Sequence, residues 1–333
     1  MALKVAINGF GRIGRNILRA YLESPVPEIE IVAINDLASI DMAAFLLEFD
    51  TVHGRLKSPV DFDEHGLQTG AGNIRYLSER DPARLDWAAL DIDVVFECTG
   101  VFTAADKAKV HLDAGAKKVL VSAPSAGADA TVVYGVNHKI LRPEHRIISN
   151  ASCTTNCLAP VAHVLHQACG IRQGFMTTIH SYTGDQRLLD SDHRDKYRAR
   201  AAAMSMVPTT TGAAKAVGLV LPELAGKLDG VAIRVPTPNV SAVDLTFEPE
   251  TPISAEQINA ALTDAAAGPL AGVLDVTARE LVSSDLNGCP ASSVVHLDQT
   301  RVMPDGMTRV FAWYDNEWAF SQRMLDTALL LDA

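Results

Sequence analysis

Short apolar runs, many of them β-branched, recur through the first 150 residues and alternate with segments of helical periodicity, at residues 5–8, 29–35, 94–98, 119–122, 132–136 and 147–149. Such alternation is typical of a parallel sheet with crossover helices. Most runs are followed by small or polar residues, which in a doubly wound sheet line the ligand crevice. Each of these residues taken singly could also only start a loop. The set favours a doubly wound α/β domain.

From residue 151 the pattern changes to a mixture of helix and alternating strand. A helix is expected at 152–168, where Pro160 should kink it or remove one backbone hydrogen bond. Residues 175–182 alternate as a strand that places Met176, Thr178 and His180 on one face. A polar, arginine-rich surface loop (183–200), a helix (212–221), strands of a second sheet (230–235, 241–247 and 309–314) and a closing helix that returns to the first domain are expected to follow.

Length and charge limit the possible partners. A chain of 333 residues is too long for one typical core, so two domains are expected. The net charge of −11 opposes binding to nucleic acid or anionic membranes, so an anionic substrate would need a local basic pocket. The chain starts directly in a strand pattern, and no apolar stretch reaches the roughly 18 residues of a membrane span.

The five cysteines are irregularly spaced, at Cys98, Cys153, Cys157, Cys169 and Cys289. Neither a disulfide framework nor a metal site is expected from them. A reducing cytoplasm fits this usage best.

A glycine motif follows the first strand: Gly9, Gly11 and Gly14 form Gly-x-Gly-x-x-Gly and open a helix. In that context the glycines permit a tight turn, close approach to a pyrophosphate and close helix packing. Asp36 ends the second strand, where an acidic residue accepts hydrogen bonds from the adenosine ribose. This favours NAD, because a carboxylate would repel the 2′-phosphate of NADP. Asp36 could instead be a helix N-cap or an exposed turn residue.

Cys153 stands at the expected start of a helix, where the dipole and free N–H groups favour a thiolate nucleophile. A cysteine there could also be a small buried residue. Cys157, one turn further, is expected to be structural, without a disulfide to Cys153. His180, near the end of a strand, is the candidate base, although the sequence does not show its distance from the sulfur.

Five ordered motifs resemble phosphorylating glyceraldehyde-3-phosphate dehydrogenase over nearly the whole chain: NGFGRIGR at 8–15, ASCTTNC at 151–157, HSYT at 180–183, RVPTPN at 234–239 and WYDNEW at 313–318. The resemblance implies that Cys153 attacks the aldehyde of D-glyceraldehyde 3-phosphate and that His180 accepts a proton. Hydride then passes to NAD, and inorganic phosphate releases 1,3-bisphosphoglycerate from the thioester, in glycolysis or gluconeogenesis.

The fold expected from pattern and resemblance is a Rossmann doubly wound NAD-binding domain plus an α+β catalytic domain with a mainly antiparallel sheet. The first covers residues 1–150, completed by the C-terminal helix 316–333, and the second covers 151–315. The resemblance also suggests a homotetramer, with the long loop at an interface and near a neighbour's cofactor site.

The resemblance extends the cofactor site beyond the glycines and Asp36. Asn316 would fix the nicotinamide carboxamide, and backbone groups of Arg12 and Ile13 would contact the pyrophosphate. Arg80, Thr99 and Ser122 would line the rest of the crevice, although Arg80 could be a surface turn and Ser122 only a strand end.

Two phosphates need two groups of donors. By resemblance the substrate phosphate takes Thr183, Asp185 and Arg234, and the attacking phosphate takes Ser152, Thr154, Arg198, Thr211 and Gly212. A helix start and a bidentate arginine suit anions in general. Thr211 could equally be a plain N-cap and Arg198 a solvated loop charge.

The chain departs from many relatives at Ser191 and Asp192, where it resembles photosynthetic forms that also accept NADP. NADP is therefore possible, but two carboxylates, Asp36 and Asp192, still favour NAD. The alternatives are erythrose-4-phosphate dehydrogenase and, from another class, a nucleic-acid-binding or scaffold protein that retains a dinucleotide fold. The acidic charge and the complete set of site residues argue against the second.

Overall fold

The computed structural model describes residues 2–331, so Met1 and the last two residues of the expected C-terminal helix lie outside the described residues. The chain divides into two compact units. Unit 1 contains the chain up to Tyr134, His138–Ser152 and the residues from Phe320 on, and unit 2 contains Gly135–Asn137 and Cys153–Ala319.

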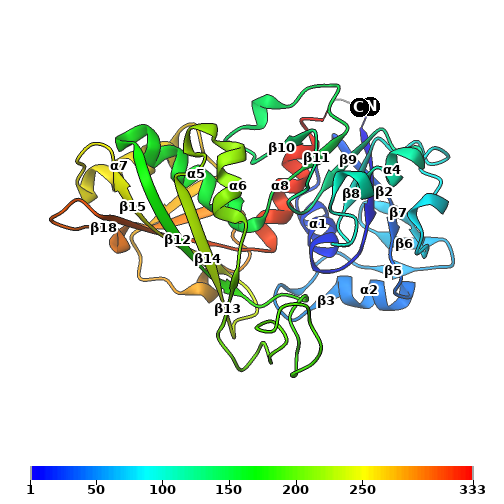
Figure 1. The fold of residues 1–333 in the computed structure, drawn as a ribbon. Helices are drawn as coiled ribbons and strands as arrows, with labels where there is room; N and C mark the ends of the chain where they lie inside the picture. Colours follow the sequence, from blue (N-terminus) through cyan, green and yellow to red (C-terminus); the bar gives the residue numbers. More distant parts are fainter. Residues whose placement is uncertain (1, 332–333) are drawn as a thin grey trace. The chain divides into compact units, whose positions relative to one another are not determined.

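Unit 1 is built on a sheet in the order β10-β11-β9-β8-β1-β2-β7-β6-β5. From β10 to β7 every neighbouring pair is parallel, as in a doubly wound fold, and β6 and β5 add an antiparallel edge. Figure 1 labels β9, β8, β2 and β7 in this sheet. The strands of this sheet are β1 Leu3–Asn8, β2 Ile29–Asn35, β5 Asp61–Phe62, β6 Gly66–Thr69, β7 Gly72–Leu77, β8 Val94–Glu97, β9 Lys118–Val121, β10 Ala130–Thr131 and β11 Ile147–Ser149.

The remaining elements of unit 1 are its helices and one small ribbon. The helices are α1 (Arg12–Glu23), α2 (Ile40–Glu48), α3 (Ala105–Ala108) and α4 (Val110–Asp113), together with most of α8 (Trp318–Ala328). A two-stranded ribbon joins β3 (Phe49–Asp50) to β4 (Gly54–Arg55).

One predicted strand is wrong. Residues 134–136 lie in a turn, and the strand lies before them at Ala130–Thr131. Val132 and Val133 are fully buried, and the N–H of Val132 donates to the carbonyl of Ser149 at 2.8 Å, so the apolar run follows the end of the short strand into the core. The antiparallel edge β5–β7 was not predicted, because its short strands are half exposed and lack a continuous apolar run.

Unit 2 contains a sheet in the order β13-β14-β12-β15-β19-β17-β16, with β18 paired to β19. Five of its pairings are antiparallel, whereas β12–β14 and β16–β17 are parallel. Its strands are β12 Ile171–Ser181, β13 Val207–Thr210, β14 Leu228–Val235, β15 Ser241–Pro249, β16 Leu274–Thr277, β17 Ser293–His296, β18 Arg301–Val302 and β19 Thr308–Tyr314. The predicted mainly antiparallel sheet is confirmed.

Three helices cover one face of the sheet of unit 2: α5 (Cys153–Cys169), α6 (Ala213–Val220) and α7 (Ala255–Ala267). The α5 helix runs without interruption through Pro160. On β12, Met176, Thr178 and His180 are buried as predicted, whereas Phe175 and Ile179 on the opposite face are exposed. This alternation directs His180 toward the side of the sheet that the helices cover.

Over residues 2–331, no helix is both long enough and apolar enough to cross a lipid bilayer. The same residues contain no cluster of three or more His, Cys, Asp or Glu side chains that could hold a metal ion.

Within unit 1 a fully buried arginine joins α1 to the last turn of α2 and to β4. Arg19 donates to the carbonyl of Leu47 at 2.6 Å and to that of Gly54 at 2.7 Å. Arg19→Leu leaves both carbonyls without this donor, so we expect the free energy of unfolding to fall by about 3 kcal/mol, measured by urea denaturation. Arg55→Leu is the control: its pair with Glu48 is largely exposed, and its loss should cost less than about 1 kcal/mol. Equal losses in the two variants would contradict the assignment.

Candidate active site

Cys153 and His180 lie together in unit 2. Cys153 is the first residue of α5, and His180 is the penultimate residue of β12. The Cys153 sulfur lies 3.6 Å from Nε2 of His180. This is within the distance at which a base can take a thiol proton.

The contacts of His180 define which ring nitrogen faces the sulfur. Nδ1 lies 2.7 Å from the carbonyl oxygen of Ser181 and 3.1 Å from a guanidinium nitrogen of Arg234. The shorter contact is with an oxygen that can only accept, so we assign the proton to Nδ1. The Arg234 guanidinium donates to the same carbonyl at 3.1 Å and to the hydroxyl of Thr183 at 3.3 Å. The unprotonated Nε2 is therefore the atom directed at Cys153.

Burial dominates the electrostatics of this pair. Burial, reinforced by the positive charge of Arg234, lowers the pKa of His180 to about 3, so the imidazole is neutral at physiological pH. Burial also raises the pKa of the Cys153 thiol, although Arg234 and hydrogen bonds with Thr154 oppose the rise. The expectation that the helix start alone makes Cys153 a resting thiolate is wrong here, because desolvation outweighs it. The site holds a thiol facing a neutral base.

Tyr314 was missed by the sequence reasoning. Its buried hydroxyl lies 2.8 Å from Thr154 Oγ1 and 2.9 Å from Thr178 Oγ1, and its ring meets His180 edge to face. Burial holds the pKa of this phenol well above its usual value, so Tyr314 remains neutral. It ties the first turn of α5 to β12. The sequence offered one clue to this contact: the alternation of β12 places Thr178, a partner of Tyr314, on the same face as His180.

Asn316 is held by a second serine. Ser241 donates its hydroxyl to Oδ1 of Asn316 at 2.7 Å and accepts the backbone N–H of Ser181 at 3.0 Å. The amide oxygen of Asn316 is thereby linked, through Ser241 at the start of β15, to the strand that carries His180. Val240, just before Ser241, has a φ of 64°, a left-handed conformation that is rare for a β-branched residue.

The predicted phosphate residues separate into two groups. Thr183 and Arg234 meet beside His180, as described above. Arg198 has different partners: its guanidinium donates to a carboxylate oxygen of Asp185 at 2.7 Å and to the hydroxyl of Thr209 at 3.1 Å. The carboxylate of Asp185 therefore pairs with the guanidinium of Arg198. Because a carboxylate repels a phosphate, Asp185 is better suited to orienting Arg198 than to contacting a phosphate itself.

The other members of the second predicted group are less clearly directed at an anion. Thr211 accepts the N–H of Ala213, the first residue of α6, at 3.2 Å, and Gly212 rather than Thr211 is the N-cap residue of that helix. The Thr154 hydroxyl is engaged by Tyr314. Ser152 precedes Cys153 in the chain.

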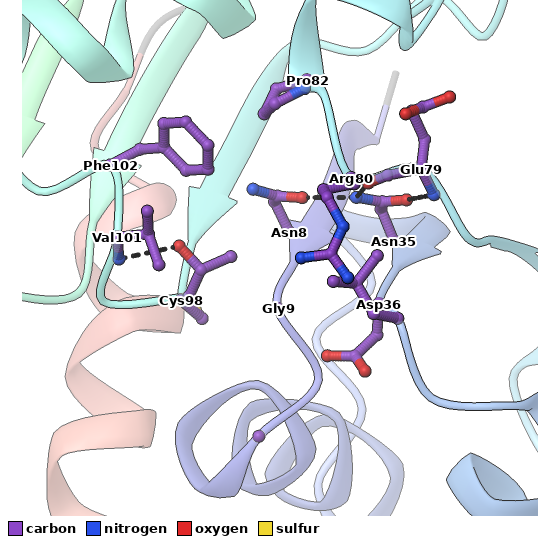
Figure 2. A pocket seen from close by; sticks show the side chains of 13 residues that line it. Asn8, Gly9, Asn35, Asp36, Glu79, Arg80, Pro82, Cys98, Val101 and Phe102 are labelled. Atoms are coloured by element: carbon purple, nitrogen blue, oxygen red, sulfur yellow. Dashed lines mark hydrogen bonds between the residues drawn. The ribbon is translucent and has the colours of Figure 1, made fainter. Parts of the chain in front are cut away.

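A pocket of about 500 Å³ lies at the carboxyl ends of β1, β2 and β8 in unit 1 (Figure 2). It is lined by Asn8, Gly9, Gly11, Asn35, Asp36, Leu37, Glu79, Arg80, Pro82, Cys98, Thr99, Val101 and Phe102. Five of the predicted cofactor residues are in this set: Gly9, Gly11, Asp36, Arg80 and Thr99. Arg12, Ile13, Gly14 and Ser122 are not; the side chain of Arg12 pairs with Asp50, and that of Ser122 donates to the carbonyl of Glu97.

The three glycines fit the roles expected of them. Gly9 has a φ of 95°, and a Cβ there would lie 2.6 Å from the backbone nitrogen of Thr99. A Cβ on Gly14 would lie 2.1 Å from the Gly9 carbonyl oxygen, so only glycine lets α1 pack this closely. At Gly11 a Cβ would meet nothing within 4 Å, and no side chain caps the helix there. The start of α1 thus borders open space at Gly11, as a pyrophosphate site needs.

Asp36 is oriented by backbone donors. Its carboxylate accepts the N–H of Phe10 at 2.6 Å and that of Ala38 at 2.9 Å. Figure 2 shows it at the mouth of the pocket, below Arg80. The Asp36 carboxylate is thus fixed beside a helix start and beside a cavity with polar residues at its floor. This arrangement fits the adenosine half of NAD.

Comparison with known proteins identifies the family of the chain. Residues 3–105 match the model of the glyceraldehyde 3-phosphate dehydrogenase NAD binding domain, and residues 152–316 match that of the C-terminal domain. The chain belongs to the glyceraldehyde-3-phosphate dehydrogenase family. It is 60% identical to the enzymes named glyceraldehyde-3-phosphate dehydrogenase from Cereibacter sphaeroides and Xanthobacter flavus, over 99% of each chain. The protein of that name from Geobacillus stearothermophilus is 54% identical over 98% of both chains.

Membership of this family makes the chain an NAD-dependent oxidoreductase and confirms the predicted Rossmann and catalytic folds. The cofactor of the matched domain is NAD, as predicted.

The influence of Arg234 on the Cys153 thiol is directly testable. Arg234→Met removes a positive charge that lowers the pKa of Cys153, so the fraction of thiolate at pH 7 should fall. We expect alkylation by iodoacetamide to slow by roughly tenfold, since one pKa unit changes the thiolate fraction by that factor. Arg187→Met is the matched control, because this exposed arginine contacts the backbone of Asp192 and is not among the charges that act on Cys153. An unchanged rate in Arg234→Met would contradict the electrostatic assignment.

Proposed function

We propose that this chain oxidises D-glyceraldehyde 3-phosphate to 1,3-bisphosphoglycerate through a thioester on Cys153, in glycolysis or gluconeogenesis. The observation that carries the proposal is the contact between the Cys153 sulfur and the unprotonated Nε2 of His180. The family and its closely similar relatives, all named for this activity, support it.

The chemistry follows from a thiol that faces a neutral base. As the sulfur bonds to the aldehyde carbon, the thiol proton passes through His180 to the aldehyde oxygen and gives a hemithioacetal. His180 then takes the hydroxyl proton while the hydride leaves the same carbon, and a thioester remains. Bound NAD supplies the hydride acceptor. Attack by inorganic phosphate expels the sulfur and releases the acyl phosphate.

Two separate guanidinium groups serve the two phosphates in this proposal. Arg234, with Thr183, binds the substrate phosphate beside the catalytic pair. Arg198, oriented by Asp185, serves the attacking phosphate together with Ser152, Thr154, Thr211 and Gly212. Both arginines present N–H groups that can form paired hydrogen bonds with phosphate oxygens.

The cofactor site we propose uses the pocket of unit 1 for adenosine, with Gly9, Gly11 and the helix start for the pyrophosphate. Arg12, Ile13 and Gly14 contribute through the backbone of the first turn of α1, and Thr99 and Ser122 through the neighbouring strand ends. Asn316, with its amide oxygen engaged by Ser241, keeps its amide nitrogen as a donor for the nicotinamide carboxamide. Residues 1–150 and the C-terminal helix would form the NAD-binding domain, and 151–315 the catalytic domain.

A homotetramer in the cytoplasm is the proposed state of the protein. The face of the unit 2 sheet opposite its helices exposes Phe175, Ile179 and Val231 on adjacent strands β12 and β14. A second copy covering this face would remove that apolar surface from water. Five free cysteines, one of them the nucleophile, suit a reducing compartment.

Replacement of the nucleophile tests the reaction. Cys153→Ser should fold and bind NAD but lose turnover of glyceraldehyde 3-phosphate by at least about 10³-fold, since a hydroxyl is a far weaker nucleophile at neutral pH. Cys157→Ser, one turn along α5, is the control and should retain most activity, because Cys157 is buried against Ser293. Initial rates with erythrose 4-phosphate measured in parallel should be far lower, and a clear preference for that aldehyde would refute the proposed substrate.

Cofactor choice tests the role of Asp36. Asp36→Ser removes the carboxylate that would face a ribose 2′-substituent, so we expect kcat/KM with NAD to fall and that with NADP to rise, each by roughly tenfold. Asp192→Ser provides the comparison, because it removes the other acidic residue considered for the same discrimination. If Asp192→Ser produced the shift and Asp36→Ser did not, the assignment of Asp36 would be wrong.

A further inference from the structure

A buried polar network lies beneath the pocket of unit 1 and takes no part in the proposed chemistry. Its centre is Glu97, the last residue of β8, which is 1% exposed. Around it lie Asn8 and His111, 1% and 0% exposed. A carboxyl group so far from water is expensive to bury unless every oxygen is satisfied.

Both oxygens of Glu97 are satisfied by donors alone. Oε1 accepts the backbone N–H of Thr99 at 2.8 Å and also the Thr99 hydroxyl. Oε2 accepts the side-chain amide of Asn8 at 2.6 Å and lies 3.0 Å from Nε2 of His111. Four groups able to donate thus converge on the two oxygens of one carboxyl group.

Trp87 fixes the tautomer of His111. The indole N–H can only donate, and it lies 3.2 Å from Nδ1 of His111, so Nδ1 is unprotonated. Nε2 must then carry the proton and donate it to Glu97. The network is thus a carboxylate held by a neutral imidazole, with no cation paired to it.

The network continues from Glu97 into the floor of the pocket. The oxygen of the Asn8 side chain accepts the amide of Asn35 at 2.8 Å. Asn35 in turn exchanges two hydrogen bonds with the backbone of Glu79, at 2.8 and 2.9 Å. Figure 2 shows Asn8, Asn35 and Glu79 joined in this way at the back of the cavity.

The glycine loop is held between two members of the same network. The N–H of Gly9 donates to the carbonyl of Asn35 at 2.8 Å. On its other side, even a methyl group on Gly9 would collide with the backbone of Thr99. The position of Thr99, which Glu97 sets through two hydrogen bonds, therefore limits where the loop can lie.

We propose that Glu97 is a positioning residue for the dinucleotide site: its buried carboxylate, held by neutral His111, fixes Thr99, Asn8 and the Gly9 loop in the geometry that binds the cofactor. The inference rests on the proposed function, in that the pocket of unit 1 binds NAD. Glu97 itself is buried beneath the pocket and acts through Thr99, Asn8 and Asn35, which line it.

Replacing the carboxylate by an amide isolates this role. In Glu97→Gln the side chain keeps its size but retains one acceptor oxygen, so it satisfies Thr99 or the Asn8–His111 pair, but not both. His111 cannot adjust by moving its proton to Nδ1, because that nitrogen faces the Trp87 donor. At least one buried donor is then left without an acceptor, and the residues at the floor of the pocket must shift to satisfy it.

The experiment measures equilibrium binding of NAD and of ADP-ribose, which lacks the nicotinamide, by titration calorimetry. We expect Glu97→Gln to weaken both by at least about tenfold, while kcat at saturating NAD and KM for the aldehyde stay within about twofold. Val95→Ala is the matched control: Val95 is fully buried on the same strand but packs in an apolar cluster with Trp87. It should lower the melting temperature without weakening either ligand.

Two results would overturn the inference. One is binding by Glu97→Gln within twofold of the wild type. The other is equal weakening in Val95→Ala, which would reduce the role of Glu97 to general stability. Failure of the wild type to bind NAD would instead refute the proposed cofactor site.

A measurement on the unaltered protein tests the network even if Glu97→Gln does not fold. In ¹⁵N-histidine NMR spectra, His111 should show the Nε2–H tautomer, because Nδ1 faces the Trp87 donor. A protonated ring or an Nδ1–H tautomer would overturn the proposed arrangement.

Discussion

The catalytic geometry depends on one backbone carbonyl, that of Ser181. It accepts from Nδ1 of His180 and from the guanidinium of Arg234, and so it fixes both the imidazole and the positive charge beside it. Because Nδ1 is committed to this carbonyl, Nε2 is left as the base that faces the Cys153 sulfur. Every later step of the proposed reaction uses that orientation.

Desolvation then sets the resting state of the pair. The same burial that holds the imidazole neutral also keeps the sulfur protonated, so the nucleophile is formed when the proton moves and not beforehand. Arg234 partly offsets the cost for the thiolate and disfavours a charged imidazole. One cation thereby favours both the attacking form of the sulfur and the accepting form of the base.

In each unit a buried polar side chain connects residues beneath the site. In unit 2, Tyr314 connects Thr154 to Thr178 beneath the catalytic pair, and in unit 1 Glu97 connects Thr99 to Asn8 beneath the pocket. Neither group was found from the sequence. An isolated Tyr or Glu at a strand end has no pattern of its own, and the partners come from positions far apart in the chain.

The sequence by itself determined the elements and the chemistry: the glycine loop before α1, the buried face of β12 that carries His180, Cys153 at the start of α5, and Asp36 after β2. These follow from local periodicity and from residue types with few alternative uses. Tertiary structure alone decided the turn at 134–137, the pKa of Cys153, the pairing of Asp185 with Arg198 and the tautomers of His180 and His111. Each of these depends on which groups are buried next to one another, and the packing of strands that are distant in the sequence determines which groups those are.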